Sequence, residues 1–168
     1  MAKLEVLKYP DPRLKLVAKD VTEFDSNLEK IANDMLETMY NNNGCGLAGI
    51  QVNIQKRIFT MDISYEANKP YVIINPKIIQ QEGSQTNKEG CLSFPNLTID
   101  VTRPQKLTIE YNNTKGELLT LEASNLMAQC IHHEMEHLAG HVFLDNLSKL
   151  KFQLALRKYK KVKDKKEA

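Results

Sequence analysis

The sequence predicts an α+β fold in which mainly antiparallel strands pack around one central helix. Short runs rich in β-branched and aromatic residues gather in the middle of the chain, at 57–61, 71–74 and 106–121. Helical patterns flank these runs instead of alternating with them, which favours antiparallel pairing over parallel β-α-β units. The 168 residues contain no internal repeat and no low-complexity linker. We therefore expect a single domain, 1–168, of ordinary size.

The N-terminal helix is predicted to begin at Ser26. Ser26 and Glu29 have the spacing of a capping box. Apolar residues then recur at helical spacing, at Leu28, Ile31, Ala32, Met35, Leu36 and Met39. The segment 41–44 is Asn-Asn-Asn-Gly, which adopts left-handed conformations at low cost and should end the helix.

The second half of the chain predicts a hairpin followed by two helices. Residues 106–111 alternate, and the turn-forming segment 112–116 connects them to a second strand at 117–121. The next helix should run from about 124 to 139, with Gly140 as its stop. A C-terminal helix should start near 148, with Leu147, Leu150, Leu154 and Tyr159 packing on the body.

Composition and charge narrow the function classes. The chain is 42% hydrophobic and 26% charged, as in water-soluble globular proteins. No stretch approaches the roughly 18–20 apolar residues of a membrane span, and no signal peptide is evident at the N-terminus. We therefore expect a cytoplasmic protein with no membrane partner. The wide spacing of Cys45, Cys91 and Cys130 argues against a disulfide framework.

The C-terminal segment, about 148–168, is basic. Residues 149–168 hold nine Lys or Arg against two acids, although the whole chain has a net charge of only +2. This distribution indicates a polyanionic partner for the tail alone, or a solubilising terminus. Sequence-specific nucleic-acid binding is not expected.

The sharpest local motif is His133-Glu134-Met135-Glu136-His137. On a helix, residues four apart project from one face, so both imidazoles can bind one metal ion. Glu134 then lies beside the first ligand, within reach of a bound water. The alternative is a pair of hydrogen-bonded core histidines. A catalytic metal takes a third protein ligand, and the candidates are His141, Asp145 and Cys91.

Two further segments are notable. Cys91 lies in Glu89-Gly90-Cys91-Leu92-Ser93, where a glycine permits close backbone approach and a thiolate is a strong ligand. Residues 44–51, Gly-Cys-Gly-Leu-Ala-Gly-Ile-Gln, are rich in small residues and follow the first helix. This segment lacks the Lys-Ser/Thr of a phosphate-binding loop, which argues against nucleotide binding.

Together the three segments resemble the peptide deformylase family. Its signatures, Gly-x-Gly-Leu-Ala-Ala-x-Gln, Glu-Gly-Cys-Leu-Ser and Gln-His-Glu-x-Asp-His, correspond in order to residues 44–51, 89–93 and 132–137. The likeness extends to Tyr9-Pro10, Ile74-Asn75-Pro76, Arg103-Pro104 and Leu138-Ala139-Gly140, and so covers nearly the whole chain.

The resemblance implies a hydrolase that removes the formyl group from the N-terminal formylmethionine of newly synthesised polypeptides and releases formate. It assigns Cys91, His133 and His137 as metal ligands and Glu134 as the proton carrier. The oxyanion donors would be the Gln51 side-chain amide and the Leu92 backbone N–H. The resemblance implies Fe(II) as the natural metal, although a Cys/His/His ligand set also accepts Zn, Ni or Co.

Several residues depart from the family pattern. Gly49 replaces an alanine and should loosen the loop that presents Gln51. His132 replaces a glutamine, and Glu136 replaces an aspartate and could orient a ligand imidazole. We expect all three changes to be tolerated. Glu89 and Arg103 should pair to fix the Cys91 segment, the alternative being two solvated charges.

The resemblance also implies a pocket for the methionine side chain. Its expected residues are Cys45, Asn87, Leu126, Gln129, Cys130 and His133, and Gly46 and Gly90 are further expected substrate-binding residues. Asn87 and Gln129 stand where the family more often has aliphatic residues. Polar walls would weaken methionine binding or admit other side chains, unless both amides point to solvent at the rim.

Partners and rival functions complete the expectations. In relatives with a C-terminal helix the tail is thought to dock on the ribosome, an RNA partner that a basic tail suits. A zincin-type peptidase shares the His-Glu-x-x-His helix but gives Cys91 and Gln51 no role. An inactive formyl-peptide-binding homologue would not need Glu134.

Overall fold

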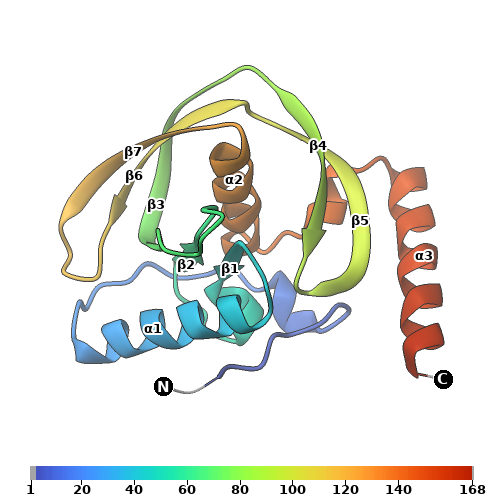
Figure 1. Ribbon diagram of the computed structural model, residues 1–168, viewed down its shortest axis with the longest axis horizontal. Helices are drawn as coiled ribbons and strands as arrows, with labels where there is room; N and C mark the ends of the chain where they lie inside the picture. The colour runs from blue at the N-terminus through green and yellow to red at the C-terminus, as the bar shows by residue number, and fades with distance from the viewer. Residues whose placement is uncertain (1–2, 168) are drawn as a thin grey trace.

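The computed structural model describes residues 3–167 and confirms the α+β class. In Figure 1 the larger sheet extends from the left to the centre, a smaller ribbon of strands lies on the right, and the helix α2 (Leu126–Leu138) lies between them. The five-stranded sheet has the order β1-β2-β3-β6-β7, and every pair of named strands is antiparallel. Its strands are β1 (Gly46–Ala48), β2 (Ile58–Met61), β3 (Tyr71–Glu82), β6 (Lys106–Asn112) and β7 (Leu118–Ser124).

The ribbon and the helices surround this sheet. The ribbon pairs β4 (Gln85–Cys91) with β5 (Phe94–Arg103). Its strands were not expected from the sequence. The α-helices are α1 (Ser26–Asn41), α2 (Leu126–Leu138) and α3 (Lys149–Glu167), and the short 3-10 helices are η1 (Pro12–Lys15), η2 (Gly49–Val52) and η3 (Phe143–Asn146).

The α1 helix begins at the predicted residue but with a different cap. The Asp25 side chain accepts the Leu28 backbone N–H at 3.0 Å, so Asp25 is the N-cap and Ser26 is the first helical residue. The predicted Ser26–Glu29 capping box is therefore wrong by one position. An aspartate suits this place because its charge also meets the positive end of the helix dipole.

Two clusters of apolar side chains cover the two faces of the five-stranded sheet. One joins α2 to the sheet through residues such as Phe59, Ile109 and Ile131, all fully buried. The other joins α1 to the sheet through Met35, Met39 and partners on β1 and β2. Burial of this kind contributes about 1.5–3 kcal/mol for each large side chain. The packing of the first cluster holds α2 against one face of the sheet.

A third cluster attaches the ribbon and α3. Phe94 lies at its centre, with ring centroids 4.8 Å from Tyr9 and 5.2 Å from Tyr159. The helix α3 turns Phe152, Ala155, Leu156 and Tyr159 toward the body. Tyr159 was predicted there, and Leu147 packs against the same cluster. This cluster holds the strand end that carries Cys91.

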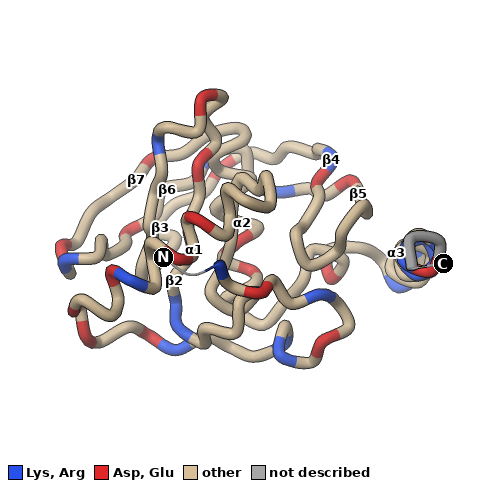
Figure 2. The backbone as a smooth tube through the Cα atoms, turned by 60° about the horizontal axis from the view of Figure 1, so that its bottom comes forward, with Lys and Arg blue, Asp and Glu red and all other residues tan. Residues whose placement is uncertain are grey.

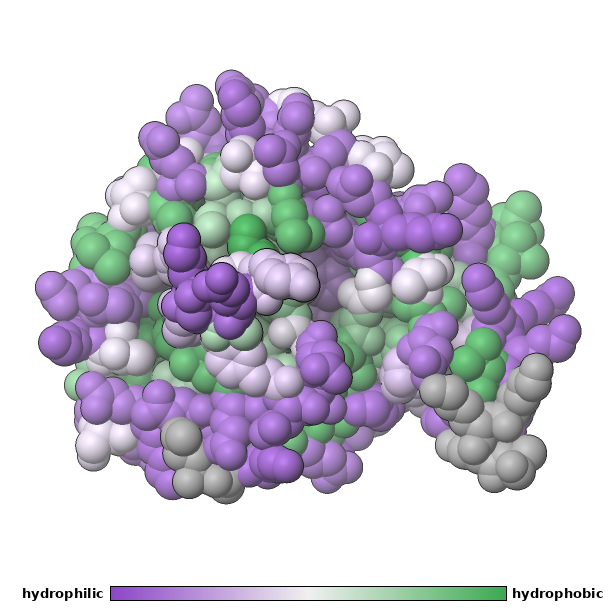
Figure 3. All heavy atoms as spheres, viewed as in Figure 1, coloured by the Kyte–Doolittle hydropathy of each residue, from purple (hydrophilic) through white to green (hydrophobic). Residues whose placement is uncertain are grey.

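Leu150 and Leu154 were expected to pack, and this expectation was wrong: they are 70% and 53% exposed. The residues that do pack follow the 3–4 spacing of one helix face, and the two leucines lie off that face. Figure 3 shows apolar residues among polar ones at the right-hand edge, where α3 lies. None of the helices in the described part of the chain has the length and apolarity needed to cross a membrane.

Candidate metal centre and active site

Three predicted ligands meet at one point between α2 and the ribbon. His133 and His137 lie one turn apart on α2, with ring centroids 5.2 Å apart. Cys91 comes from the end of β4, where the register with β5 shifts between Glu89 and Cys91. Their possible ligand atoms all lie within 4.8 Å of one another, and Cys91 Sγ is 3.4 Å from His137 Nε2. The structure thus selects Cys91 over His141 and Asp145.

The donor set fits a catalytic metal. Two imidazoles and a thiolate are the three-ligand set that leaves one coordination position for water or substrate. Both histidines are buried, and Cys91 is half-buried. Burial, with the charges of His133 and Arg103, holds the pKa of His137 well below its ordinary value. The ring is therefore neutral, which is the state that binds a metal.

Glu89 orients the first histidine. Its Oε1 lies 2.9 Å from His133 Nδ1, so the ring N–H donates to the carboxylate and Nε2 is left for a metal. Although burial raises the pKa of Glu89, the contacts with His133 and Arg103 outweigh it and lower the pKa. A carboxylate that stays ionised keeps the ring in one tautomer.

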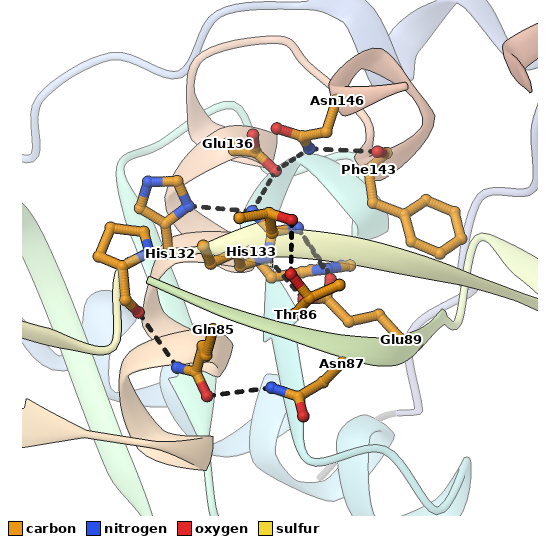
Figure 4. Close-up of polar contacts among 12 residues, drawn as sticks. Gln85, Thr86, Asn87, Glu89, His132, His133, Glu136, Phe143 and Asn146 are labelled. Carbon is orange, nitrogen blue, oxygen red and sulfur yellow. Dashed lines mark hydrogen bonds and ion pairs between the residues drawn. The ribbon is translucent and has the colours of Figure 1, made fainter. Parts of the chain in front are cut away.

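Arg103 holds Glu89 in turn, as expected. This fully buried side chain donates from Nε and Nη2 to the two Glu89 oxygens at 2.6 and 2.8 Å. Its Nη1 reaches Glu136 Oε1 at 2.7 Å and His132 Nδ1 at 2.9 Å. Figure 4 shows the resulting cluster, which Asn146 joins through a 3.0 Å bond to Glu136. The cluster ties β4, β5, α2 and η3 together.

This arrangement corrects one prediction about Glu136. We expected it to orient a ligand imidazole, but its carboxylate instead accepts from Arg103 and Asn146. His132 likewise faces Arg103, where a ring nitrogen can accept as a glutamine oxygen would. Asn146 was not predicted as part of this cluster, because it lies beyond the turn at Gly140 and meets α2 only in the folded chain.

Glu134 points its carboxylate into the same space. It is buried, and its Oε1 has no hydrogen-bond partner among the described residues. Burial raises its pKa to about 7. A buried carboxyl with a free oxygen and a pKa near neutrality has the properties of a general acid–base group.

Gly46 makes room for that carboxylate. A Cβ at this position would overlap Glu134 Oε2 and would lie 2.9 Å from Cys130 Sγ. Only a glycine lets β1 pass this close to α2. The glycine of the first motif therefore has a steric role in the site.

Gln51 is held against the thiolate ligand. Its Oε1 accepts the Ala48 N–H at 2.9 Å, and its Nε2 donates to Ser93 Oγ at 3.2 Å and faces Cys91 Sγ at 3.6 Å. Ser93 was not predicted as part of the site. These contacts fix the side-chain amide beside the ligand cluster.

Gly49 tightens the loop before Gln51, contrary to our expectation that it loosens it. Its carbonyl accepts the Ile54 N–H at 2.8 Å, and a Cβ would come within 2.7 Å of the Ile54 carbonyl oxygen. The missing side chain allows close packing here instead of mobility.

A cavity of about 630 Å³ opens next to these residues. Seven of the eight expected substrate-binding residues line it: Cys45, Gly46, Gly90, Leu126, Gln129, Cys130 and His133. Leu92 and Glu134 also line it. Asn87 does not, because its Nδ2 donates to Gln85 Oε1 at 3.0 Å on the exposed face of β4, as Figure 4 shows. The prediction that Asn87 lies in the pocket wall is therefore wrong.

Comparison with known proteins agrees with the three motifs. The polypeptide deformylase family model matches residues 3–153. A peptide deformylase from Pseudoalteromonas translucida is 48% identical over 161 residues, covering 96% of each chain. One from Neisseria gonorrhoeae is 46% identical over 151 residues, covering 90% of each.

The chain belongs to the polypeptide deformylase family.

Solved structures of the family share its fold. The peptide deformylase of Legionella pneumophila superposes with a TM-score of 0.93 at 37% identity, covering 99% of this chain and 98% of that one. That of Ehrlichia chaffeensis in complex with actinonin gives 0.90 at 39% identity, covering 96% and 98%. The resemblance drawn from the motifs is confirmed, and the chain is a metal-binding hydrolase of this family.

Proposed function

We propose that this chain removes the formyl group from the N-terminal formylmethionine of new polypeptides through the residues around Cys91. The observation that carries this proposal is the convergence of three ligand side chains, two of which, Cys91 and His133, line the same cavity as Glu134. The bond broken is the formyl C–N bond. Water supplies the hydroxyl of formate, and the peptide leaves with a free amine.

Cys91, His133 and His137 would hold one divalent metal. When bound, the metal lowers the pKa of a coordinated water from 15.7 towards about 7 and so supplies a nucleophile at neutral pH. We propose Fe(II) as the physiological ion, with Zn, Ni or Co as alternatives in purified protein. Glu89 keeps His133 in the tautomer that the site requires.

Glu134 would carry the proton. Its carboxylate faces the cavity and accepts a proton from the attacking water, then delivers it to the departing amine nitrogen. The raised pKa supports both halves of this cycle, because a group with a pKa near 7 both gains and loses a proton readily.

Gln51 and Leu92 would stabilise the developing oxyanion. Ala48 and Ser93 hold the Gln51 amide in place, so its N–H groups are preorganised next to Cys91. Leu92 directly follows Cys91 and lines the cavity, and its backbone N–H would be the second donor. Loss of one such donor typically costs about 10²–10³ in rate.

The methionine side chain would pack against the cavity wall formed by Cys45, Gly46, Leu126 and Gln129. Leu126 and Gln129 precede His133 by seven and four residues on α2, so they share one face of the helix with the ligand. Gly90 lines the opposite wall and would let the substrate backbone lie close to β4.

The basic helix α3 would dock the enzyme on the ribosome. Figure 2 shows this helix nearly end-on at the edge of the molecule, with its Lys and Arg residues around it. Such a surface suits ribosomal RNA. We propose that the protein is a single domain. We also propose that it acts in the cytoplasm, where new polypeptides emerge from the ribosome. If deletion of residues 158–168 leaves co-sedimentation with ribosomes unchanged, the docking proposal fails.

Formate release tests the reaction itself. Protein loaded anaerobically with Fe(II) should release formate from a formyl-Met peptide and leave unblocked peptides of the same sequence intact. Internal cleavage of the unblocked peptides would favour a zincin-type peptidase. Binding without formate release would favour an inactive homologue.

A further inference from the structure

Two thiols that the reaction does not use face each other in the cavity. Cys45 precedes β1, and Cys130 lies on α2 three residues before His133. Cys130 Sγ lies 3.6 Å from the Cys45 carbonyl oxygen, and the pKa of each cysteine responds to the other thiol. Cys45 is exposed to solvent, whereas Cys130 is buried. Both line the space assigned to the first side chain of the substrate.

We propose that Cys45 and Cys130 form a reversible disulfide, made by exchange with a small-molecule disulfide such as glutathione disulfide. A disulfide has a sulfur–sulfur distance of about 2.05 Å. Cys130 Sγ already contacts the Cys45 backbone, so a shift of the Gly44–Gly46 segment can bring the two sulfur atoms to this distance.

The exchange has two balanced steps. The Cys45 thiolate attacks one sulfur of the oxidant, and a glutathione thiolate leaves. Cys130 then loses its proton and attacks Cys45 Sγ in the mixed disulfide, which releases the second glutathione thiolate. The two protein thiols lose two electrons in total, and the oxidant gains them as two thiols. An exposed attacking cysteine next to a buried resolving one is the arrangement that redox-responsive sites use.

The predicted consequence is a closed side-chain pocket. The bond would tie the start of β1 to α2 and occupy the space between the two pocket walls. Gly46 already brings β1 so close to α2 that a Cβ there would meet Cys130 Sγ at 2.9 Å. Cys91 would remain free to bind the metal, because it takes no part in the exchange. This consequence rests on the proposed function of the pocket.

Peptide mapping and kinetics together test the inference. Metal-loaded protein is treated anaerobically with glutathione disulfide and digested without reduction. Mass spectrometry should find a peptide containing Cys45 linked to one containing Cys130. The catalytic efficiency on a formyl-Met peptide should fall about 10- to 100-fold, as expected when the methionine side chain can no longer be buried. The bound metal should stay constant, and dithiothreitol should restore the activity.

Two variants serve as controls, each compared with its own untreated activity. Cys45→Ser and Cys130→Ser should both lose the cross-link and the inhibition. The inference is overturned if no link between residues 45 and 130 forms, if the link includes Cys91, or if Cys45→Ser is inhibited as strongly as the parent protein. An untreated protein that releases no formate would refute the proposed function, while the cross-link would still be read from the peptide map.

Discussion

Glu89 Oε1 lies 2.9 Å from His133 Nδ1, so a carboxylate on β4 holds a metal ligand on α2 in place. The same carboxylate receives two hydrogen bonds from the buried Arg103. The position of His133 thus depends on Glu89, which contacts it directly, and on Arg103, which contacts Glu89.

Substitution Glu89→Gln should weaken the metal centre. The amide replaces one of the two accepting oxygens with an NH2 donor that would face Arg103 Nε or His133, so Arg103 would become a buried charge with one partner fewer. Metal affinity should fall about 10- to 100-fold, as measured by competition with a chelator. Glu82→Gln is the matched control, because Glu82 is exposed and pairs only loosely, at 3.7 Å, with Lys106. Unchanged affinity in Glu89→Gln would remove Glu89 from the account.

Substitution Gly46→Ala should displace Glu134 and leave the metal ligands in place. The added Cβ would overlap the Glu134 carboxylate. We expect kcat to fall by about 10² or more, since general acid–base catalysis contributes that much, with the metal content unchanged. At Gly90 the nearest protein atom to an added Cβ lies at 3.8 Å, so Gly90→Ala should lower kcat far less, and its effect should appear in KM because Gly90 lies on the proposed substrate path. Equal losses in the two variants would contradict the steric role of Gly46.

Substitution Gln129→Leu should change side-chain selectivity. Gln129 lines the cavity one turn before His133, and its amide loses water when an apolar side chain packs on it. The variant should raise kcat/KM for formyl-Met peptides about tenfold. Peptides that begin with formyl-Ala should change little, because their side chain is too short to reach this wall. If both substrates respond equally, Gln129 does not contact the first side chain.

Tyr40 and Asp62 give the fold a pH-dependent contribution. The Tyr40 hydroxyl donates to Asp62 Oδ2 at 2.6 Å. Burial raises the pKa of Asp62, but hydrogen bonds from Ser64, Tyr40 and Lys69 outweigh it and lower the pKa. Burial and the bond to Asp62 raise the pKa of Tyr40 to about 12.

Tyr40→Phe should therefore destabilise the protein at pH 7 by about 1 kcal/mol. Because the pKa of Asp62 is lowered on folding, its contribution is present above the unfolded value of about 3.9 and is lost as the pH falls below it. The deficit measured by urea unfolding should shrink at pH 3. The same deficit at both pH values would show that the ionised carboxylate is not responsible.

Local patterns predicted the part of the site that lies within one element. His133 and His137 were predicted because four residues make one helical turn. Cys91 could be chosen from its rivals only through the family motif, because its approach to α2 depends on how β4 ends. The contacts of Arg103 with His132, Glu136 and Asn146 join segments far apart in the chain, and no periodicity reveals them.

The strand β4 and the buried face of α3 were not predicted for a similar reason. The β4 segment, Gln-Thr-Asn-Lys-Glu-Gly-Cys, lacks apolar alternation and buries only Glu89 fully, so strand formation there depends on pairing with β5. On α3, leucines occur on more than one face, and only the packed cluster around Phe94 shows which face is buried.

The central claim is that Glu134 carries the proton for formyl hydrolysis at a metal held by Cys91, His133 and His137. The most direct test measures formate release from a formyl-Met peptide by metal-loaded wild type and Glu134→Gln, with the bound metal determined in each sample. The account predicts equal metal content and a kcat about 10²–10⁴ lower in the variant. A variant that binds the metal fully and still releases formate at the wild-type rate would contradict it.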